Sequence, residues 1–366
     1  MIKPQKLNKG DKIAIVSLSS GILGMPYCEH ELKIALKRLK EMELVPIIMP
    51  NALKGVDYIK EHPEARAADL KQAFMDDSIK GIICAIGGDD TYKTIPYLME
   101  DEEFKEAVKN NPKIFTGFSD TTINHLMLNK LGLSTFYGPC VIVDLAELDN
   151  DMLPYTKEQF YKFFSNDSNY EITSSPIWYK ERESFGVEEI GKPREACREQ
   201  HGFETLNGNG IVSGSLYGGC IESIYDAFTG NRYSEEPQIF EDYKIFPTDE
   251  EWKEKILFLE TSEEKPNPEK LEKMLVEFKK RKILSLVKGI IVGKPQDEQY
   301  YEEYKEVYRN VFKDLNTPVL FNVNFGHSVP RCIIPYDAEA TVDYDNRRIF
   351  INSPLFENEK NKNLDR

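Results

Sequence analysis

Residues 79–88, "IKGIICAIGG", are typical of a buried strand that ends in a pair of glycines. A second such strand is predicted at 113–117, "KIFTG", where a polar turn, "FSDTT", leads into a helix over 121–131. The helical spacing of apolar residues predicts further helices over 29–42 and 63–76. Strands that alternate with helices indicate a parallel sheet flanked by helices, so this part of the chain is predicted to be an α/β domain.

The same alternation returns near the other end of the chain. Strands are predicted at 255–261, "KILFLET", at 287–295, "VKGIIVGKP", and at 318–327, "PVLFNVNFGH". The stretch between the two α/β units is highly charged and has few periodic apolar runs, so it is predicted to be a crossover with long loops. We therefore expect three parts: residues 1–165, 166–210 and 211–366.

Composition restricts the classes of partner. The chain has 366 residues, 40% of them hydrophobic and 30% charged, with a net charge of -15. A net negative protein is poorly suited to bind nucleic acid polymers or anionic membranes, which attract basic surfaces. The six cysteines form no C-x-x-C pair, and no signal region or membrane span is recognisable, so a reducing cytoplasm is expected.

Ser119 is the first candidate for chemistry. A serine at a sharp turn between a strand and a helix resembles a nucleophile elbow, in which the hydroxyl projects from the sheet edge. The G-x-S-x-G pattern is incomplete, because Thr121 stands at its fifth position. The alternative is that Ser119 or Asp120 caps the following helix, and the local pattern alone favours this alternative.

The pair Gly87 and Gly88 ends a neighbouring strand. Backbone amides at the carboxyl edge of a parallel sheet often contact ligands, so the Gly88 N–H is a candidate oxyanion donor. An ordinary tight turn is the simpler interpretation of this pair taken alone. The next residues, Asp89 and Asp90, would allow a carboxylate metal site, but no companion ligands are recognisable, and no metal is expected.

A serine nucleophile needs a base, and the chain has only five histidines. His327 follows a strand and a glycine, so it is expected in a loop at the carboxyl end of a strand. His125 falls on the helix after Ser119, where it can simply pack. A base also needs an orienting acid. Glu260 ends an apolar strand and is the candidate, whereas Glu263 and Glu264 are expected to be solvated charges.

These motifs together resemble a known family. The segments "LNKGDKIAIVSLSSG", "RAADLKQAF", "IGGDDTYKTIPYL", "GFSDTT", "SGSLYGGCIESI", "LFLETSEE" and "FGHSVP" follow the order seen in serine peptidases of the LD-carboxypeptidase family. The resemblance extends from about residue 6 to residue 345. The "GGDD" and "LETSEE" segments look more like the branch of microcin C immunity proteins than like the murein tetrapeptide carboxypeptidases.

The resemblance implies a Ser-Glu-His triad that falls on Ser119, Glu260 and His327. It implies an oxyanion hole formed by the backbone amides of Gly88 and Asp120. The family fold is an N-terminal Rossmann-like domain and a C-terminal α/β domain with the active site between them, commonly as a homodimer. Such chemistry requires no cofactor.

Two departures from the family bear on the substrate. Relatives commonly have Asn after the second glycine pair, where this chain has Cys220, which we interpret as a packing residue. Microcin-cleaving relatives stack the nucleotide base on a Trp, and Phe185 stands nearest to that position. Further candidate substrate contacts are Gly87, Asp89 and Trp178.

The resemblance implies hydrolysis of an amide bond in microcin C-like peptidyl or aminoacyl nucleotides. The alternative is murein tetrapeptide carboxypeptidase activity that releases terminal D-alanine. A third possibility, of another class, is a non-catalytic α/β module that binds a nucleotide or a small anion. In each case the partner is a small molecule, with no nucleic acid polymer and no membrane involved.

Overall fold

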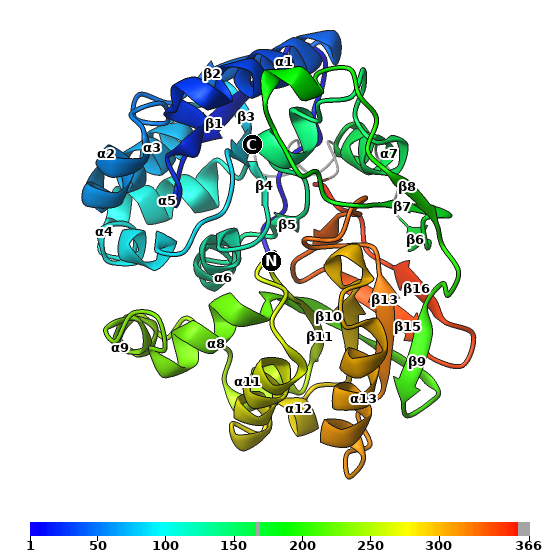
Figure 1. The fold of residues 1–366 in the computed structure, drawn as a ribbon. Helices are drawn as coiled ribbons and strands as arrows, with labels where there is room; N and C mark the ends of the chain where they lie inside the picture. The colour runs from blue at the N-terminus through cyan, green and yellow to red at the C-terminus, as the bar shows by residue number, and fades with distance from the viewer. Residues whose placement is uncertain (166–168, 358–366) are drawn as a thin grey trace.

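The computed structural model describes residues 1–165 and 169–357. Its first sheet lies in the upper half of Figure 1 and has the strand order β14-β5-β4-β3-β1-β2. Strands β1 to β5 are parallel, and β14 pairs with β5 in the antiparallel sense. The strand bounds are β1 (Lys12–Val16), β2 (Val45–Ile48), β3 (Ile79–Cys84), β4 (Ile114–Gly117), β5 (Phe136–Tyr137) and β14 (Ile334–Pro335).

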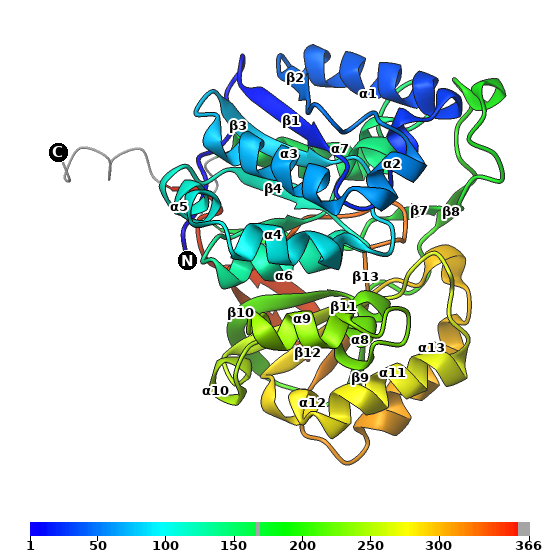
Figure 2. The same cartoon turned by 90° about the vertical axis from the view of Figure 1, so that its left-hand side faces the viewer.

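Helices of the N-terminal half flank this sheet, as predicted from the alternation of strands and helices. Figure 2 shows α3 in front of the strands, and α3 contacts both β1 and β3. Proline at the first position starts α3, where its missing N–H is not needed. The helix bounds are α1 (Glu29–Glu41), α2 (Val56–Glu61), α3 (Pro63–Met75), α4 (Ile95–Met99), α5 (Glu102–Asn110), α6 (Thr121–Lys130) and α7 (Pro154–Tyr161).

The second sheet fills the lower half of Figure 1 and has the order β6-β16-β15-β10-β11-β12-β13-β9. Its central strands β10 to β13 are parallel, and antiparallel strands complete both sides. Its strand bounds are β6 (Tyr170–Ile172), β9 (Glu204–Asn207), β10 (Ile211–Cys220), β11 (Lys255–Glu260), β12 (Gly289–Gly293), β13 (Val319–Val323), β15 (Glu339–Asp343) and β16 (Arg348–Ile351). The accompanying helices are α8 (Ile221–Thr229), α9 (Glu236–Asp242), α10 (Asp249–Trp252), α11 (Pro268–Lys280), α12 (Ile283–Leu286) and α13 (Tyr301–Phe312).

The predicted α/β class is confirmed, but the segment over 145–210 is more ordered than expected. It contains α7, β6, β9 and a separate hairpin of β7 (Ile177–Tyr179) with β8 (Ala196–Arg198). These strands are three or four residues long. So short a strand shows no hydrophobic period, and it is held by backbone pairing with distant strands.

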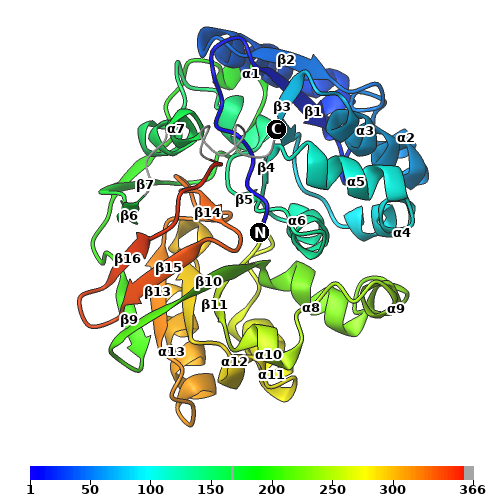
Figure 3. The ribbon, with the colours of Figure 1, turned by 180° about the vertical axis from the view of Figure 1, so that it is seen from behind.

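The two halves are joined by more than one passage of the chain. Figure 3 shows β14, which comes from the C-terminal half, beside β5 of the first sheet. The buried apolar side chains form one cluster that includes strands of both sheets. The carboxyl ends of β4 and β11 meet between the halves, which places the residues after these strands together. Among the described residues, no helix combines the length and apolarity needed to cross a bilayer.

Candidate active site

Ser119 occupies the turn between β4 and α6, and its backbone is held in an unusual conformation. Its φ angle is 65°, in the left-handed region that residues with a side chain seldom adopt. Such strain persists only where the surroundings enforce it. Here the Ser119 N–H donates to the Tyr137 hydroxyl at 3.0 Å, and Gly87 leaves space that a Cβ would fill at 2.7 Å from the Ser119 Cβ.

His327 and Glu260 converge on Ser119 from the second sheet. The His327 Nε2 atom lies 3.1 Å from Ser119 Oγ, and its Nδ1 atom lies 2.8 Å from Glu260 Oε2. The His327 backbone N–H donates to the same carboxylate oxygen at 3.1 Å, and the Tyr137 hydroxyl donates to Glu260 Oε1 at 2.6 Å. Both oxygens of Glu260 are therefore occupied, which fixes the carboxylate and, through it, the imidazole ring.

Glu263 competes with Ser119 for the same nitrogen of His327. Its Oε2 atom lies 2.8 Å from His327 Nε2, although the Glu263 side chain is 64% exposed. Burial lowers the pKa of His327, but the charges and hydrogen bonds of Glu260 and Glu263 outweigh it and raise the pKa to about 10. Both carboxylates therefore favour the charged form of the imidazole.

Gly88 and Asp120, whose backbone amides are the predicted oxyanion donors, line the same small cavity as Ser119. Gly88 and Ser119 also line a larger cavity, and a Cβ on Gly87 would lie 3.2 Å from the Asp120 nitrogen. Neither of these two amides donates a hydrogen bond to any residue within the described ranges. Two N–H groups without a partner among the described residues, one of them at the start of α6, can receive a developing negative charge.

The Asp120 carboxylate has a separate, structural position. It is buried and accepts hydrogen bonds from Ser19 Oγ at 2.6 Å and from the Thr91 N–H at 2.9 Å. Burial, together with the charges of Asp90 and Asp89, raises the pKa of Asp120 to about 6 against the opposing effect of those hydrogen bonds. This carboxylate ties the segments after β1, β3 and β4 together, which positions the amide next to it.

The two aspartates after the glycine pair are held by other side chains. Asp90 is buried in an ion pair with the Arg66 guanidinium at 2.6 Å. Asp89 accepts from the Tyr233 hydroxyl at 3.1 Å, away from Asp90. Each carboxylate has its own protein partner, and among the described residues no group of three or more His, Cys, Asp or Glu side chains is arranged to hold a metal ion.

A cavity of about 360 Å³ opens beside Ser119 and His327. This volume lies in the range of small-molecule sites. Phe185 lines the cavity and is 40% exposed, so its ring face is accessible. Trp178 does not line it, because this side chain is 7% exposed and its ring lies 5.1 Å from the Lys294 ammonium. Of the two predicted aromatic contacts, Phe185 therefore borders the cavity beside Ser119 and Trp178 does not.

Three residues at the site were not predicted to lie there: Tyr137, Glu263 and Arg331. Tyr137 bridges Ser119 and Glu260. The only feature that marks it in the sequence is that a glycine and a proline follow it. Glu263 contacts His327 instead of being a free solvated charge. The Arg331 guanidinium stacks 4.2 Å from the Phe118 ring centroid, and Phe118 packs edge-on against the His327 ring.

Two other candidates have structural roles. His125 is fully buried, bonds to the Gly117 carbonyl and the Thr135 hydroxyl, and has a pKa lowered by burial to about 3. Cys220 is buried, and burial together with the Glu222 and Glu260 charges raises the pKa of its thiol well above the usual value. A thiol held in this protonated form is a poor nucleophile.

Comparison with known proteins defines the class to which this fold and site belong. Residues 13–138 match the LD-carboxypeptidase N-terminal domain, and residues 213–342 match the LD-carboxypeptidase C-terminal domain. The protein is a serine peptidase, and therefore a hydrolase. The chain belongs to the LD-carboxypeptidase family, as the resemblance predicted.

Three relatives show which members of the family this chain resembles. A crystal structure of an MccF-like protein from Streptococcus pneumoniae in complex with AMP is 45% identical, with a TM-score of 0.87 over 93% of this chain and 98% of that one. The microcin C7 self-immunity protein MccF of Escherichia coli is 27% identical over 81% of this chain and 80% of its own. A probable murein peptide carboxypeptidase of Bacillus subtilis is 33% identical over 48% of this chain and 52% of its own.

Proposed function

We propose that Ser119, His327 and Glu260 form the catalytic triad of a carboxypeptidase-type hydrolase. The observation that carries this proposal is the unbroken chain of contacts from Ser119 Oγ to His327 Nε2 at 3.1 Å and from His327 Nδ1 to Glu260 at 2.8 Å. Ser119 attacks the substrate carbonyl while His327 takes its proton. Glu260 holds the ring in the required tautomer and stabilises its charged form.

The Gly88 and Asp120 amides form the oxyanion hole in this proposal. Both are unpaired within the described residues, so they need not break a bond to bind the oxyanion. One such donor typically contributes about 3 kcal/mol to stabilising the transition state. His327 then returns its proton to the leaving nitrogen, and water hydrolyses the acyl-enzyme by the reverse sequence of proton transfers.

Glu263 must leave His327 before this sequence can begin. A general base has to be unprotonated, and its Nε2 lone pair has to face Ser119. The Glu263 side chain is largely exposed, so its ion pair is screened by solvent and is readily exchanged for water. Substrate that fills the cavity between Phe185 and Ser119 would displace this carboxylate.

Microcin C-like peptidyl or aminoacyl nucleotides are the substrates we propose, which makes the protein a self-immunity or detoxifying enzyme. The S. pneumoniae relative, which was solved with AMP, supports this assignment, as does the exposed Phe185 ring in the cavity. Phe presents a stacking face without the hydrogen-bond donor of Trp. Base stacking alone would favour a nucleotide without selecting strongly among bases.

The second candidate is release of terminal D-alanine from murein tetrapeptides. The B. subtilis murein peptide carboxypeptidase supports it, although that likeness covers about half of each chain. Parallel mass-spectrometric assays on a processed microcin C analogue and on a murein tetrapeptide separate the two. We expect cleavage of the nucleotide substrate, and D-alanine release from the tetrapeptide alone would reverse this order.

Ser119→Ala tests the nucleophile. We expect it to lower kcat by roughly 10⁴-fold or more while the thermal unfolding midpoint stays close to that of the parent. Ser285→Ala, which alters an exposed serine on α12, is the matched control and should retain full activity. Hydrolysis by the Ser119→Ala variant at the parental rate would exclude the serine mechanism.

A cytoplasmic homodimer remains part of the proposal. Light scattering of the purified chain would give a mass of twice 42.2 kDa for a dimer. A mass of one chain across the working concentration range would contradict it.

A further inference from the structure

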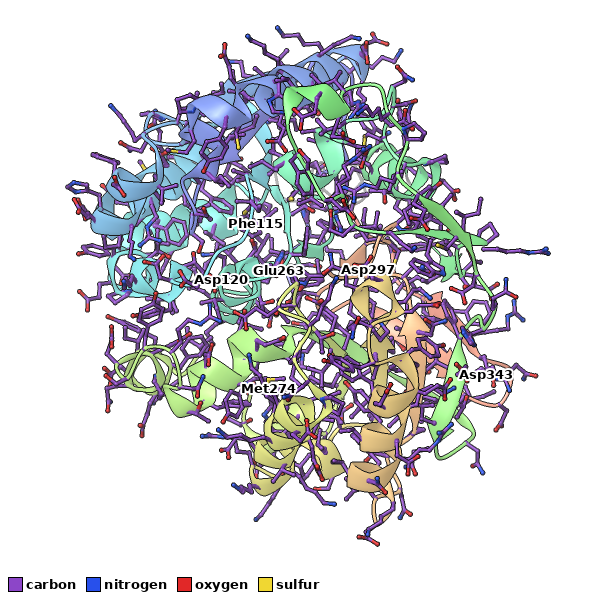
Figure 4. All side chains as sticks on the ribbon, viewed as in Figure 1. Phe115, Asp120, Glu263, Met274, Asp297 and Asp343 are labelled. Carbon is purple, nitrogen blue, oxygen red and sulfur yellow. The ribbon has the colours of Figure 1, made fainter. Side chains whose placement is uncertain are left out.

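A second, smaller cavity of about 30 Å³ also reaches Ser119. We call this cavity the acidic recess. Seven acidic residues line it: Asp89, Asp120, Glu222, Asp226, Glu236, Glu263 and Glu264. Figure 4 labels Asp120 and Glu263 at the boundary between the two halves, where the recess lies. Arg232 is its single basic lining residue within the described ranges. The wall next to the nucleophile is thus strongly negative.

Most of these carboxylates are already engaged. Glu222 Oε1 accepts from the Ser262 N–H at 3.0 Å and from its hydroxyl at 2.8 Å. Glu264 pairs with the Arg232 guanidinium at 2.8 Å and with the Lys270 ammonium at 2.9 Å. The one lining cation is therefore shared among several acids and leaves little positive charge for the rest.

Glu236 is the exception, and it carries the inference. It stands at the first position of α9, is 4% exposed, and lines the recess. Its carboxyl group has no hydrogen bond and no ion pair with any residue in the part of the chain that the structure describes. Burial, followed by the charges of Asp120 and Asp226, raises its pKa to about 9. A buried carboxyl group without a protein partner is costly, and because Glu236 lines the recess, this group is free to pair with a donor on a ligand.

We propose that the acidic recess receives a primary ammonium group carried by the acyl part of the substrate, with Glu236 as its buried partner. This inference rests on the proposed function, since it assigns the acyl side of the same reaction. The recess is far smaller than the main cavity of about 360 Å³, and its acidic lining favours a compact cation over a phosphate. Because Ser119 lines the recess, the ammonium belongs to the acyl group whose carbonyl Ser119 attacks.

The ammonium has two chemical sources, the α-amine and a side-chain amine. Four sulfamoyl adenosines distinguish them: lysyl, Nα-acetyl-lysyl, norleucyl and Nα-acetyl-norleucyl. If the α-amine is bound, acetylation lowers kcat/KM for both amino acids. If the side-chain amine is bound, the lysyl compounds exceed the norleucyl compounds whether acetylated or not. Equal kcat/KM for all four overturns the inference and leaves the proposed function standing.

Binding to the Ser119→Ala variant separates this inference from the reaction itself. The same four compounds are titrated calorimetrically against that variant, so that affinity is measured without turnover. A preference for the ammonium-bearing compounds in Kd, with no hydrolysis by the parent, would refute the proposed function and retain the recess. Equal Kd values for all four would refute the recess.

Glu236→Gln tests the assigned partner directly. We expect the ratio of kcat/KM between ammonium-bearing and neutral compounds to fall by about 10-fold or more, as for the loss of one hydrogen bond to a charged group. Glu241→Gln makes the same change at an exposed position of α9 and should leave the ratio unchanged. If Glu236→Gln fails to fold, Asp226→Asn removes a second lining carboxylate and should lower the same ratio. An unchanged ratio in a folded Glu236→Gln or Asp226→Asn variant overturns the inference.

Discussion

The His327 imidazole contacts two carboxylates and one hydroxyl. The two carboxylates raise the pKa of the ring and so determine how its protonation depends on pH. Glu260 holds one ring nitrogen in a buried contact, whereas Glu263 reaches the other from solvent. The first contact keeps the ring oriented for catalysis. The second favours the protonated ring, and in the proposed mechanism it is lost when substrate fills the cavity.

Replacing Glu263 should therefore shift the pH profile. Glu263 is one of the groups that raise the pKa of His327 to about 10, so Glu263→Gln should lower that pKa. A base works in its unprotonated form, and the midpoint of the acidic limb of kcat/KM should then move to lower pH. The measurement is kcat/KM across pH for the parent and the variant.

Glu272→Gln, at an exposed position of α11, serves as the control and should leave the midpoint in place. An unchanged or higher midpoint in Glu263→Gln would show that this contact does not raise the pKa of His327 in the free enzyme.

Strand ends, more than any single motif, made the site predictable. Gly88 and Ser119 follow strands of the first sheet, whereas Glu260 ends a strand of the second sheet and His327 follows another. Parallel pairing brings the strand ends of each sheet to one edge of that sheet. A site between the two halves was implied only by the family resemblance, and the sequence did not reveal which further side chains join them. Tyr137 joins Ser119 to Glu260 because β5 lies beside β4, and no local pattern encodes that neighbourhood.

A buried ion pair holds the loop of His327 against the first sheet. The Arg331 guanidinium contacts Asp144, which lies in the short π-helix η4 (Val141–Leu145), and it also donates to the Gly326 carbonyl at 2.7 Å. Both partners are almost fully buried, so neither is solvated if the other is removed. Removing either partner would therefore leave an unpaired buried charge, and this cost exceeds what the attraction of the intact pair contributes.

Asp144→Ala should destabilise the fold. It leaves a buried guanidinium without its carboxylate, and we expect the free energy of unfolding to fall by about 3–5 kcal/mol. Urea denaturation measures this loss. Glu171→Gln breaks an ion pair with Arg348 that is partly exposed, and by comparison should cost about 1 kcal/mol or less. Equal effects of the two substitutions would contradict this account.

The molecule as a whole is less divisible than its sequence suggested. Boundaries at 165 and 210 remain a prediction, but β14 lies far beyond both and completes the sheet of the first part. A two-residue strand carries no periodic signal, so its partner cannot be predicted from the sequence alone. The alternation of helices and strands predicts the two α/β halves of the fold. The return of the chain to the first sheet, by contrast, is set by tertiary packing.

We therefore expect the whole molecule to unfold in one cooperative step. The shared sheet and the common apolar core leave neither half complete without the other. Calorimetry should give a single transition whose calorimetric and van't Hoff enthalpies agree. Two resolved transitions, or a folded fragment 1–165 that remains monomeric, would show that the halves are independent.

The left-handed backbone of Ser119 is strained for a residue with a side chain, whereas the proposed chemistry requires that side chain. Glycine adopts this conformation without strain, so Ser119→Gly should be more resistant to heat than Ser119→Ala, although both lack the hydroxyl. Selection for hydrolysis is then what keeps a side chain at this position. A lineage released from that selection would drift toward glycine here, and a chain carrying it would be a binding protein descended from an enzyme.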